Sequence, residues 1–271
     1  MSDPATDPAA DHARPSSPTI AQLREVTQPP SVRTRAGAEH WVASAYLRDL
    51  SPYLTRVLLR AGCSANGVTW LMVGCAAGAA VATAWPTLAG ALLAVVLVQL
   101  QMLLDCSDGE VARWRGTSSP LGVYLDRVGH YIAECGIAVA LGVRVTGGPQ
   151  ASGVWISAGL LLGLLVALNK VENDLVHVAR HYAGMPRVAD VESVKVPTRS
   201  LLRRARRLAR FVPFHRVFHS VELSLLVLAA ALLDLVLDGD ASRVLLGGLV
   251  VAAGITVVGH LAAVLASPRL R

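Results

Sequence analysis

Six long runs of apolar residues constrain the fold of this chain more than any other feature. A helix of roughly 17 to 25 apolar residues is long enough to cross the ~30 Å hydrocarbon core of a membrane. The runs are apolar all round, whereas helices of a soluble bundle would show apolar stripes with a period of 3.6 residues. Only 16% of the residues are charged, against about a quarter in an average soluble domain. The sequence therefore predicts an all-α membrane protein with six transmembrane helices, near 66–84, 88–112, 121–143, 152–173, 217–237 and 243–266.

The remaining segments differ from these runs in composition. Residues 1–37 are rich in Pro, Ala, Ser, Thr and Asp, which predicts a disordered cytoplasmic tail. Residues 38–62 mix aromatic and leucine side chains with arginines, which predicts an amphipathic helix at the membrane interface, with an ordinary solvated helix as the alternative. A six-helix membrane domain is then expected over 63–266 and a short cytoplasmic tail over 267–271. Arginines along one side of 199–216 predict a second interfacial helix on anionic lipid.

Lysine and arginine are distributed unevenly between the two expected sides of the membrane. Of the 25 such residues, only Arg144 and Arg243 fall on one side. Because cytoplasmic loops are enriched in Lys and Arg, we expect both termini on the cytoplasmic side of a cell membrane. The net charge of +6 is then explained by topology and by contact with anionic membrane lipids. We expect no nucleic-acid binding, because no folded basic domain remains to provide it.

The stretch from 103 to 130, LLDCSDGEVARWRGTSSPLGVYLDRVGH, gathers charged groups in this otherwise apolar chain. Asp105 and Asp108 are three residues apart, so both carboxylates lie on one face of a helix. A glycine, a Ser/Thr cluster and a proline at 114–120 predict a turn into the next helix. One face of that second helix carries Gly122, Asp126 and His130. Since a short turn makes the two helices antiparallel neighbours, three carboxylates and an imidazole are expected around one point.

This arrangement suits a cation and a phosphorylated ligand. Clustered carboxylates repel one another unless a cation lies among them, and oxygen ligands in this number suit Mg²⁺ or Mn²⁺. The small residues Gly109 and Ala112 would let a bulky ligand approach the backbone, and Arg113 could clamp phosphate oxygens. Ionisable groups at membrane depth usually mark a functional site. Phosphoryl-group chemistry is therefore predicted, with a buried ion-pair cluster as the alternative.

These residues resemble the signature of the CDP-alcohol phosphotransferase family. That signature is D-x-x-D-G-x-x-A-R, eight residues, G, three residues, D, three residues, D, and seven of its eight fixed positions match here. The stretch SANGVTW at 64–70 is also similar to the family's N-x-V-T stretch. The resemblance implies an integral-membrane transferase that moves a substituted phosphoryl group from a CDP-alcohol, often CDP-diacylglycerol, to an alcohol acceptor. CMP is released, and the product is a phospholipid or a related phosphodiester.

The resemblance also implies roles for individual residues. Mg²⁺ or Mn²⁺ would be bound by Asp105, Asp108, Asp126 and His130. The nucleotide side would be formed by Asn66, Thr69, Asp105, Gly109, Ala112, Arg113, Ser119 and Gly122. The family's last aspartate, generally assigned as a metal ligand and as the base, is His130 here. We expect His130 and Asp126 to be catalytic, because an imidazole is a competent base near neutral pH. The substitution also leaves open a site with a single metal ion, or a chain that has lost catalysis.

Polar residues beyond the motif suggest an acceptor site. Lys170 and Arg180 lie on one polar face that continues the fourth apolar run, and they could contact a phosphorylated acceptor; a solvated basic face is the alternative. Glu134, one turn beyond His130, would either orient the imidazole or line a polar wall. Glu110 is expected to point away from the aspartates, because successive helix residues are rotated by about 100°.

Two other functions remain compatible with the sequence. A catalytically silent, nucleotide-binding homologue could act as a partner of another enzyme, and metal-dependent CMP release would distinguish it from a transferase. A transporter is less compatible, because the sequence shows no inverted repeat or interrupted pair of spans. Small-residue stretches such as GGLVVAAG permit close helix contacts and hence a homodimer.

Overall fold

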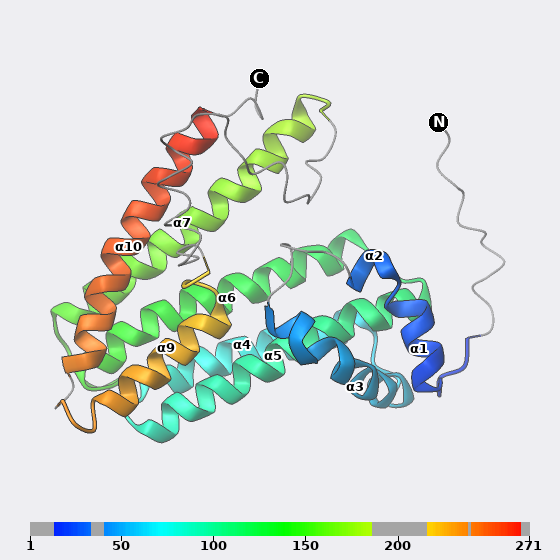
Figure 1. The fold of residues 1–271 in the computed structure, drawn as a ribbon, viewed down its shortest axis with the longest axis horizontal. Helices are drawn as coiled ribbons and strands as arrows, with labels where there is room; N and C mark the ends of the chain where they lie inside the picture. Colours follow the sequence, from blue (N-terminus) through cyan, green and yellow to red (C-terminus); the bar gives the residue numbers. More distant parts are fainter. Residues whose placement is uncertain (1–13, 34–40, 186–215, 238–239, 267–271) are drawn as a thin grey trace. The chain divides into compact units, whose positions relative to one another are not determined.

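The computed structural model describes residues 14–33, 41–185, 216–237 and 240–266 (Figure 1). All regular structure in these ranges is helical, which confirms the all-α class. A π-helical turn, Ala43–Leu47, leads into the third helix. The α-helices are α1 (Ile20–Thr27), α2 (Pro30–Arg33), α3 (Arg48–Arg60), α4 (Ala65–Ala84), α5 (Leu88–Arg115), α6 (Pro120–Thr146), α7 (Val154–Tyr182), α9 (Ser220–Leu233) and α10 (Asp240–Leu265).

The chain divides into two compact units. The first comprises the described parts of Met1–Met72 and Gln101–Arg127, and the second those of Val73–Leu100 and Val128–Arg271. The division passes through α4, α5 and α6, each of which is one continuous helix. The first unit therefore contains the aspartates of the charged stretch together with the N-terminal helices.

Five of the described helices are long and apolar enough to cross a membrane: α4, α5, α6, α7 and α10. The expected sixth span, 217–237, is not confirmed, because α9 has only 14 residues, or about 21 Å at 1.5 Å per residue. The helix ends where Asp234 accepts hydrogen bonds from the backbone N–H and the hydroxyl of Ser242. These bonds tie the end of α9 to the start of α10 and replace the last turns that we expected.

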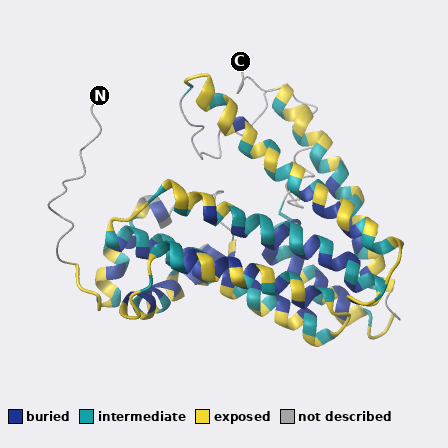
Figure 2. Cartoon of the chain, turned by 180° about the vertical axis from the view of Figure 1, so that it is seen from behind, coloured by how far each residue is buried: buried dark blue, intermediate teal, exposed yellow. Residues whose placement is uncertain are grey.

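The burial pattern of α10 is that of a helix which faces lipid. Leu246 and Leu249 are buried, and α10 packs against α7 and α9. On the other faces Val251, Ile255 and Val258 remain 64%, 70% and 69% exposed. Exposed residues recur along α10 in Figure 2. So much exposed apolar surface is unfavourable in water but suits a hydrocarbon environment. The structure thus supports the integral-membrane class that the apolar runs predict.

Helices α6 and α7 approach each other closely at a pair of glycines. A Cβ atom added to Gly159 would lie 2.7 Å from the Cα of Gly142, which is too close for any side chain. Small residues allow such contact between membrane helices, where van der Waals packing replaces the hydrophobic effect as the source of stability. This contact fixes α7 against the C-terminal half of α6.

The N-terminal segment differs from our expectation of disorder. Residues 20–27 form α1, which begins with a capping box: Thr19 Oγ1 accepts from the Gln22 N–H, and Gln22 Oε1 accepts from the Thr19 N–H. Leu23, Thr27 and Gln28 are buried. The T-x-x-Q capping signal is present in the sequence, but the surrounding Pro- and Ser-rich composition obscures it. The expectation for 1–13 and 34–37 lies outside the described residues. The same holds for the tail at 267–271 and, apart from residue 216, for the expected helix over 199–216.

The region expected to be an interfacial helix is helical from Ala43 to Arg60. Large apolar and aromatic side chains recur on it every three or four residues and are 43–59% exposed: Tyr46, Leu50, Tyr53 and Val57. Such a stripe suits insertion into a membrane surface. The interfacial position itself remains a prediction. The buried face of this helix carries Ser51 and Thr55, both completely buried.

Candidate metal and nucleotide site

The charged stretch lies on two helices joined by a short turn, as predicted. Helix α5 ends at Arg115 and α6 begins at Pro120. Gly116 has a φ of 67°, a left-handed conformation that glycine adopts without strain. Ser119 accepts a hydrogen bond from the Gly122 N–H at 3.1 Å and so satisfies a backbone donor at the start of α6. Local sequence signals were enough to predict this turn.

Two carboxylates and an imidazole of the motif form a candidate metal site. Asp105 of α5 and Asp126 of α6 each offer an oxygen, and His130, one turn further along α6, offers a ring nitrogen. These ligand atoms all lie within 4.8 Å of one another, and the three residues are half-buried. Oxygen donors suit both Mg²⁺ and Mn²⁺. An imidazole nitrogen is a softer ligand and favours Mn²⁺ over Mg²⁺. The donor set therefore fits a divalent cation.

Asp108 is held by a threonine of the first transmembrane helix. Thr69 Oγ1 donates to Asp108 Oδ2 at 2.7 Å. The charges of Asp105 and Asp126 lie near enough to repel the Asp108 carboxylate. The group of closely spaced ligand atoms does not include Asp108. Among the described residues the structure thus distinguishes two aspartates grouped with His130 from a third that is bound to Thr69.

Three of the expected nucleotide-binding residues come together at the start of α6. A Cβ atom added to Gly122 would lie 3.2 Å from Asn66 Oδ1 and 3.5 Å from Ser119 Oγ. The absence of a side chain at Gly122 therefore lets the polar groups of Asn66 and Ser119 lie close against the backbone of α6. Glycine permits such a close approach of a polar group to the backbone.

The side chain of Arg113 lies over Gly109, which is one turn earlier on α5. A Cβ atom added to Gly109 would be 3.1 Å from Nη1 and 3.4 Å from Nη2 of Arg113. On its other side, Arg113 Nε donates to the carbonyl of Thr27 at 2.7 Å. A residue of the N-terminal segment thus orients the arginine of the motif. Sequence reasoning missed this contact because it expected no structure there.

Glu110 is the main polar group of this region that sequence reasoning set aside. Its side chain is completely buried. Oε1 accepts from Gln28 Nε2 at 2.8 Å and from Ser51 Oγ at 2.5 Å, and Oε2 accepts from Thr55 Oγ1 at 2.6 Å. The signal that could have suggested a partner is the i, i+4 pair of hydroxyl residues at 51 and 55, which lie on one helix face.

The residues expected to bind the acceptor lie in the second unit. Lys170 Nζ is 2.8 Å from Glu134 Oε2 and lies 5.2 Å from the centre of the Tyr131 ring. His219 Nδ1 is 3.6 Å from the other oxygen of Glu134. Glu134 therefore has an ion-pair partner, and much of the charge of Lys170 is already balanced.

Arg180 lies far from Lys170 along α7. The two residues are ten positions apart on the continuous helix α7, which corresponds to about 15 Å of helical rise. An acceptor that contacts both residues would therefore depend on their long side chains reaching toward each other along α7. The shared acceptor role stays a prediction.

Comparison with known proteins bears on the whole arrangement. No curated protein sequence matches the chain. The model of the CDP-alcohol phosphatidyltransferase family matches residues 62–203. This range includes every residue of the motif in α5 and α6, together with Asn66, Thr69, Lys170 and Arg180. By this match, which covers more than half of its length, the chain belongs to the CDP-alcohol phosphatidyltransferase family.

Proposed function

We propose that the protein is an integral-membrane transferase that moves a phosphatidyl or similar substituted phosphoryl group from a CDP-alcohol to an alcohol acceptor and releases CMP. The family transfers such groups from CDP-alcohols, and CDP-diacylglycerol is the donor that we place first. The observation that carries the proposal is the group of ligand atoms from Asp105, Asp126 and His130 within 4.8 Å. We propose that this site faces the cytoplasm, in agreement with the distribution of Lys and Arg.

Different residues of the site would bind different parts of the donor. Asp105 and Asp126 would hold a divalent cation, whose positive charge would neutralise the diphosphate oxygens and make CMP a better leaving group. Arg113, oriented by the Thr27 carbonyl, adds hydrogen bonds to phosphate oxygens. The polar side chains of Asn66 and Ser119, which lie against Gly122, would contact the nucleoside side of the donor.

His130 stands where the family motif has its last aspartate. As a neutral imidazole it can accept the proton of the acceptor hydroxyl or donate one lone pair to the metal. One negative charge fewer also weakens the site for a second cation, so a single ion is the expected occupancy. We place His130 in the acceptor half of the reaction and Arg113 in the donor half.

The acceptor proposal rests on Lys170 of α7. Its ion pair with Glu134 means that a phosphorylated acceptor would have to compete with a buried carboxylate. Arg180 lies outside this cluster and remains a separate candidate. The homodimer remains a prediction, since nothing in the structure tests it.

The decisive experiment is CMP release by the detergent-purified full chain. The assay contains CDP-diacylglycerol, Mg²⁺ or Mn²⁺, and a pool of inositol phosphate, glycerol phosphate and serine. We expect metal-dependent CMP release with one acceptor, and Asp105→Asn should lower it by about a thousandfold or more, because the charge that binds the cation is lost. Donor binding without CMP release under any condition would instead favour the catalytically silent homologue, an alternative that the histidine at 130 keeps open.

His130→Asp tests the substitution in the motif directly. A carboxylate is a harder ligand than an imidazole, so we expect the ratio of Mg²⁺-supported to Mn²⁺-supported activity to rise by about threefold or more. The measurement is CMP release at matched metal concentrations. An unchanged ratio would show that His130 does not bind the metal and would leave it only the role of base.

A further inference from the structure

Glu110 is completely buried, and a buried carboxylate needs hydrogen-bond donors at short distance and in good geometry. Burying an ionised carboxylate is strongly unfavourable unless hydrogen bonds replace those from water. Three neutral donors do this here: the amide of Gln28 and the hydroxyls of Ser51 and Thr55, at 2.5–2.8 Å. Hydrogen bonds to neutral donors depend strongly on distance and direction, so this set fixes α5 more tightly than a diffuse charge interaction would. We call these four residues the Glu110 network.

The donors come from two elements that precede the transmembrane helices. Ser51 and Thr55 belong to α3, while Gln28 directly follows α1. The Gln28 amide also contacts other groups, because Nε2 donates to the carbonyl of Arg48 at 2.6 Å and lies 3.5 Å from Ser51 Oγ. The Glu110 network therefore joins the N-terminal segment, residues 14–33, and α3 to the functional end of α5.

The same N-terminal segment makes further contacts with the last turn of α5. Arg14 Nη1 donates to the carbonyls of Arg113 and Trp114, both at 3.0 Å, and its guanidinium lies 5.6 Å from the centre of the Trp114 ring. Trp114 Nε1 in turn donates to the carbonyl of Pro15 at 3.2 Å. The last carbonyls of a helix lack intrahelical partners and carry partial negative charge, so a guanidinium stabilises them.

These contacts act on the turn of α5 that carries the donor-binding groups. Asp108, Gly109 and Arg113 surround Glu110 in sequence, and a helix rotates by about 100° per residue. Any rotation of this turn that broke the Glu110 network would also move Asp108 and Arg113. In addition, the Thr27 carbonyl holds Arg113 Nε directly. The matched family range begins at residue 62, so the N-terminal segment lies outside it.

We propose that the N-terminal segment 14–33 is a positioning element of the donor site, anchored by Glu110. Glu110 and Gln28 do not touch the donor; they hold Asp108 and Arg113 where the diphosphate binds. The inference rests on the proposed function, because it assigns the segment to the donor half of that reaction. It predicts that disturbing the network weakens donor binding and leaves acceptor binding unchanged.

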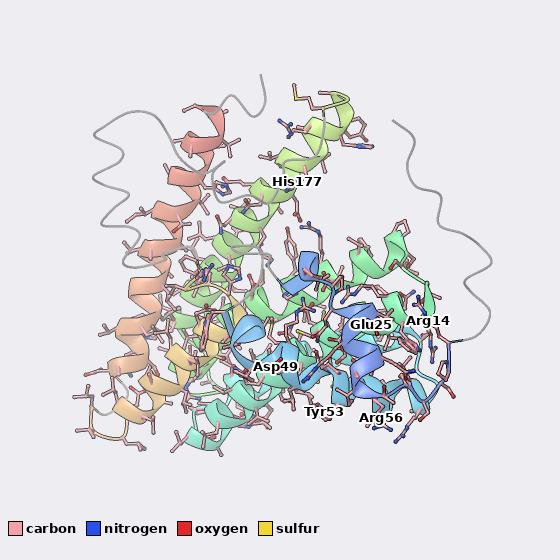
Figure 3. All side chains as sticks on the ribbon, turned by 45° about the vertical axis from the view of Figure 1, so that its right-hand side comes forward. Arg14, Glu25, Asp49, Tyr53, Arg56 and His177 are labelled. Carbon is pink, nitrogen blue, oxygen red and sulfur yellow. The ribbon has the colours of Figure 1, made fainter. Side chains whose placement is uncertain are left out.

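The experiment exchanges the two partners in full-length protein. Gln28→Glu sets a second carboxylate against Glu110, Glu110→Gln removes the charge, and the double variant restores an amide opposite a carboxylate. Glu25→Gln is the matched control, since Glu25 is exposed on α1 (Figure 3). For each protein, three quantities are measured: the KM for CDP-diacylglycerol, the KM for the acceptor, and the Kd for CDP with Mg²⁺ by calorimetry.

We expect Gln28→Glu to raise the donor KM and the Kd for CDP by about tenfold or more, because like charges meet in a buried site. Glu110→Gln should raise both by about threefold to tenfold, and the double variant should recover a large part of the loss. The recovery is incomplete because the carboxylate introduced at position 28 would also face the carbonyl of Arg48, to which Gln28 donates in the wild type. The KM for the acceptor should change by less than about twofold in every variant, and Glu25→Gln should match the wild type.

Other outcomes overturn the inference. A lower melting temperature with unchanged donor KM and CDP affinity would show that the network is only structural. A parallel rise in the KM for donor and acceptor would show a general distortion. If a charged variant does not accumulate as folded protein, Gln28→Ala decides the question, because it removes only one of the three donors to Glu110. Wild-type protein that neither binds CDP nor releases CMP would contradict the proposed function itself, before any variant is compared.

Discussion

Two glutamates of the transmembrane helices, one in each unit, are buried by opposite means. Glu110 of α5 is completely buried and accepts hydrogen bonds from three neutral groups. Glu134 of α6 is 3% exposed and pairs with the ammonium of Lys170, with His219 near its other oxygen. In the second unit a charge balances a charge, whereas in the first unit geometry alone stabilises the carboxylate. The hydrogen bonds to Glu110 hold the side chain in one position, whereas the ion pair of Glu134 neutralises a buried charge.

The difference bears on substrate binding as well as on stability. A lysine whose charge is balanced by a buried carboxylate is a weaker ligand for phosphate than a lysine in water. The three donors to Glu110, by contrast, bring no charge and leave the negative potential of the aspartates on α5 undiminished. This negative potential favours the binding of a cation at Asp105 and Asp126, and the proposed reaction requires such a cation.

The largest expected effect comes from removing one member of the ion pair. Lys170→Met leaves Glu134 buried without its ammonium partner and should lower the free energy of unfolding by about 3 kcal/mol. Thermal unfolding in detergent measures the loss. The double variant Glu134→Gln/Lys170→Met removes both charges and should recover most of it. Equal losses in the single and double variants would mean that the pair stabilises the second unit by packing and not by charge.

A smaller effect is expected at the Glu110 network. Thr55→Val removes one hydroxyl donor with almost no change of volume, and it should lower the free energy of unfolding by about 2 kcal/mol, because hydrogen bonds to charged groups contribute about 1.5–3 kcal/mol. Thr83→Val is the matched control. Thr83 is also completely buried, but its hydroxyl donates to the carbonyl of Ala79 in its own helix at 2.9 Å. If Thr55→Val and Thr83→Val lower the free energy of unfolding equally, the hydrogen bond to Glu110 is no stronger than one within a helix.

The sequence predicted those features that depend on neighbours along the chain. The turn at Gly116 follows from local turn chemistry, and the structure has it there. Helical periodicity and this turn led us to expect three carboxylates and His130 around one point, and the structure groups Asp105, Asp126 and His130 without Asp108. The partners of Glu110 could not be predicted in this way, because Gln28 is 82 residues away in sequence and Thr55 is 55 residues away. The 100° rotation rule gave the direction in which Glu110 points but not what lies there.

In the described residues the structure differs from two expectations that rested on composition more than on local signals. The N-terminal segment contains enough Pro and Ser to suggest disorder, yet the capping box at Thr19 and the buried Leu23 allow a helix of 8 residues that packs against folded protein. The sixth apolar run is long enough to span a membrane in sequence. Asp234 nevertheless ends α9 early, because its carboxylate binds Ser242 at the start of α10.

The smallest expected effect lies at the edge of the first unit. Arg14 caps the carbonyls of Arg113 and Trp114 and lies over the Trp114 ring. Arg14→Ala should lower the free energy of unfolding by about 1 kcal/mol, since a cation at a helix C-terminus and a cation–π contact each contribute about 0.5–1 kcal/mol in exposed positions.

Arg243→Ala is the matched control in the second unit. Arg243 pairs with Asp240 at 3.0 Å, but both side chains are well exposed, so its removal should change the stability by less than about 0.5 kcal/mol. Thermal unfolding and the donor KM are measured for both variants. If the N-terminal segment positions the donor site, Arg14→Ala should raise the donor KM by about twofold or more and Arg243→Ala should not change it. If the two variants are indistinguishable in both measurements, Gln28 and Thr27 must hold the segment without help from Arg14.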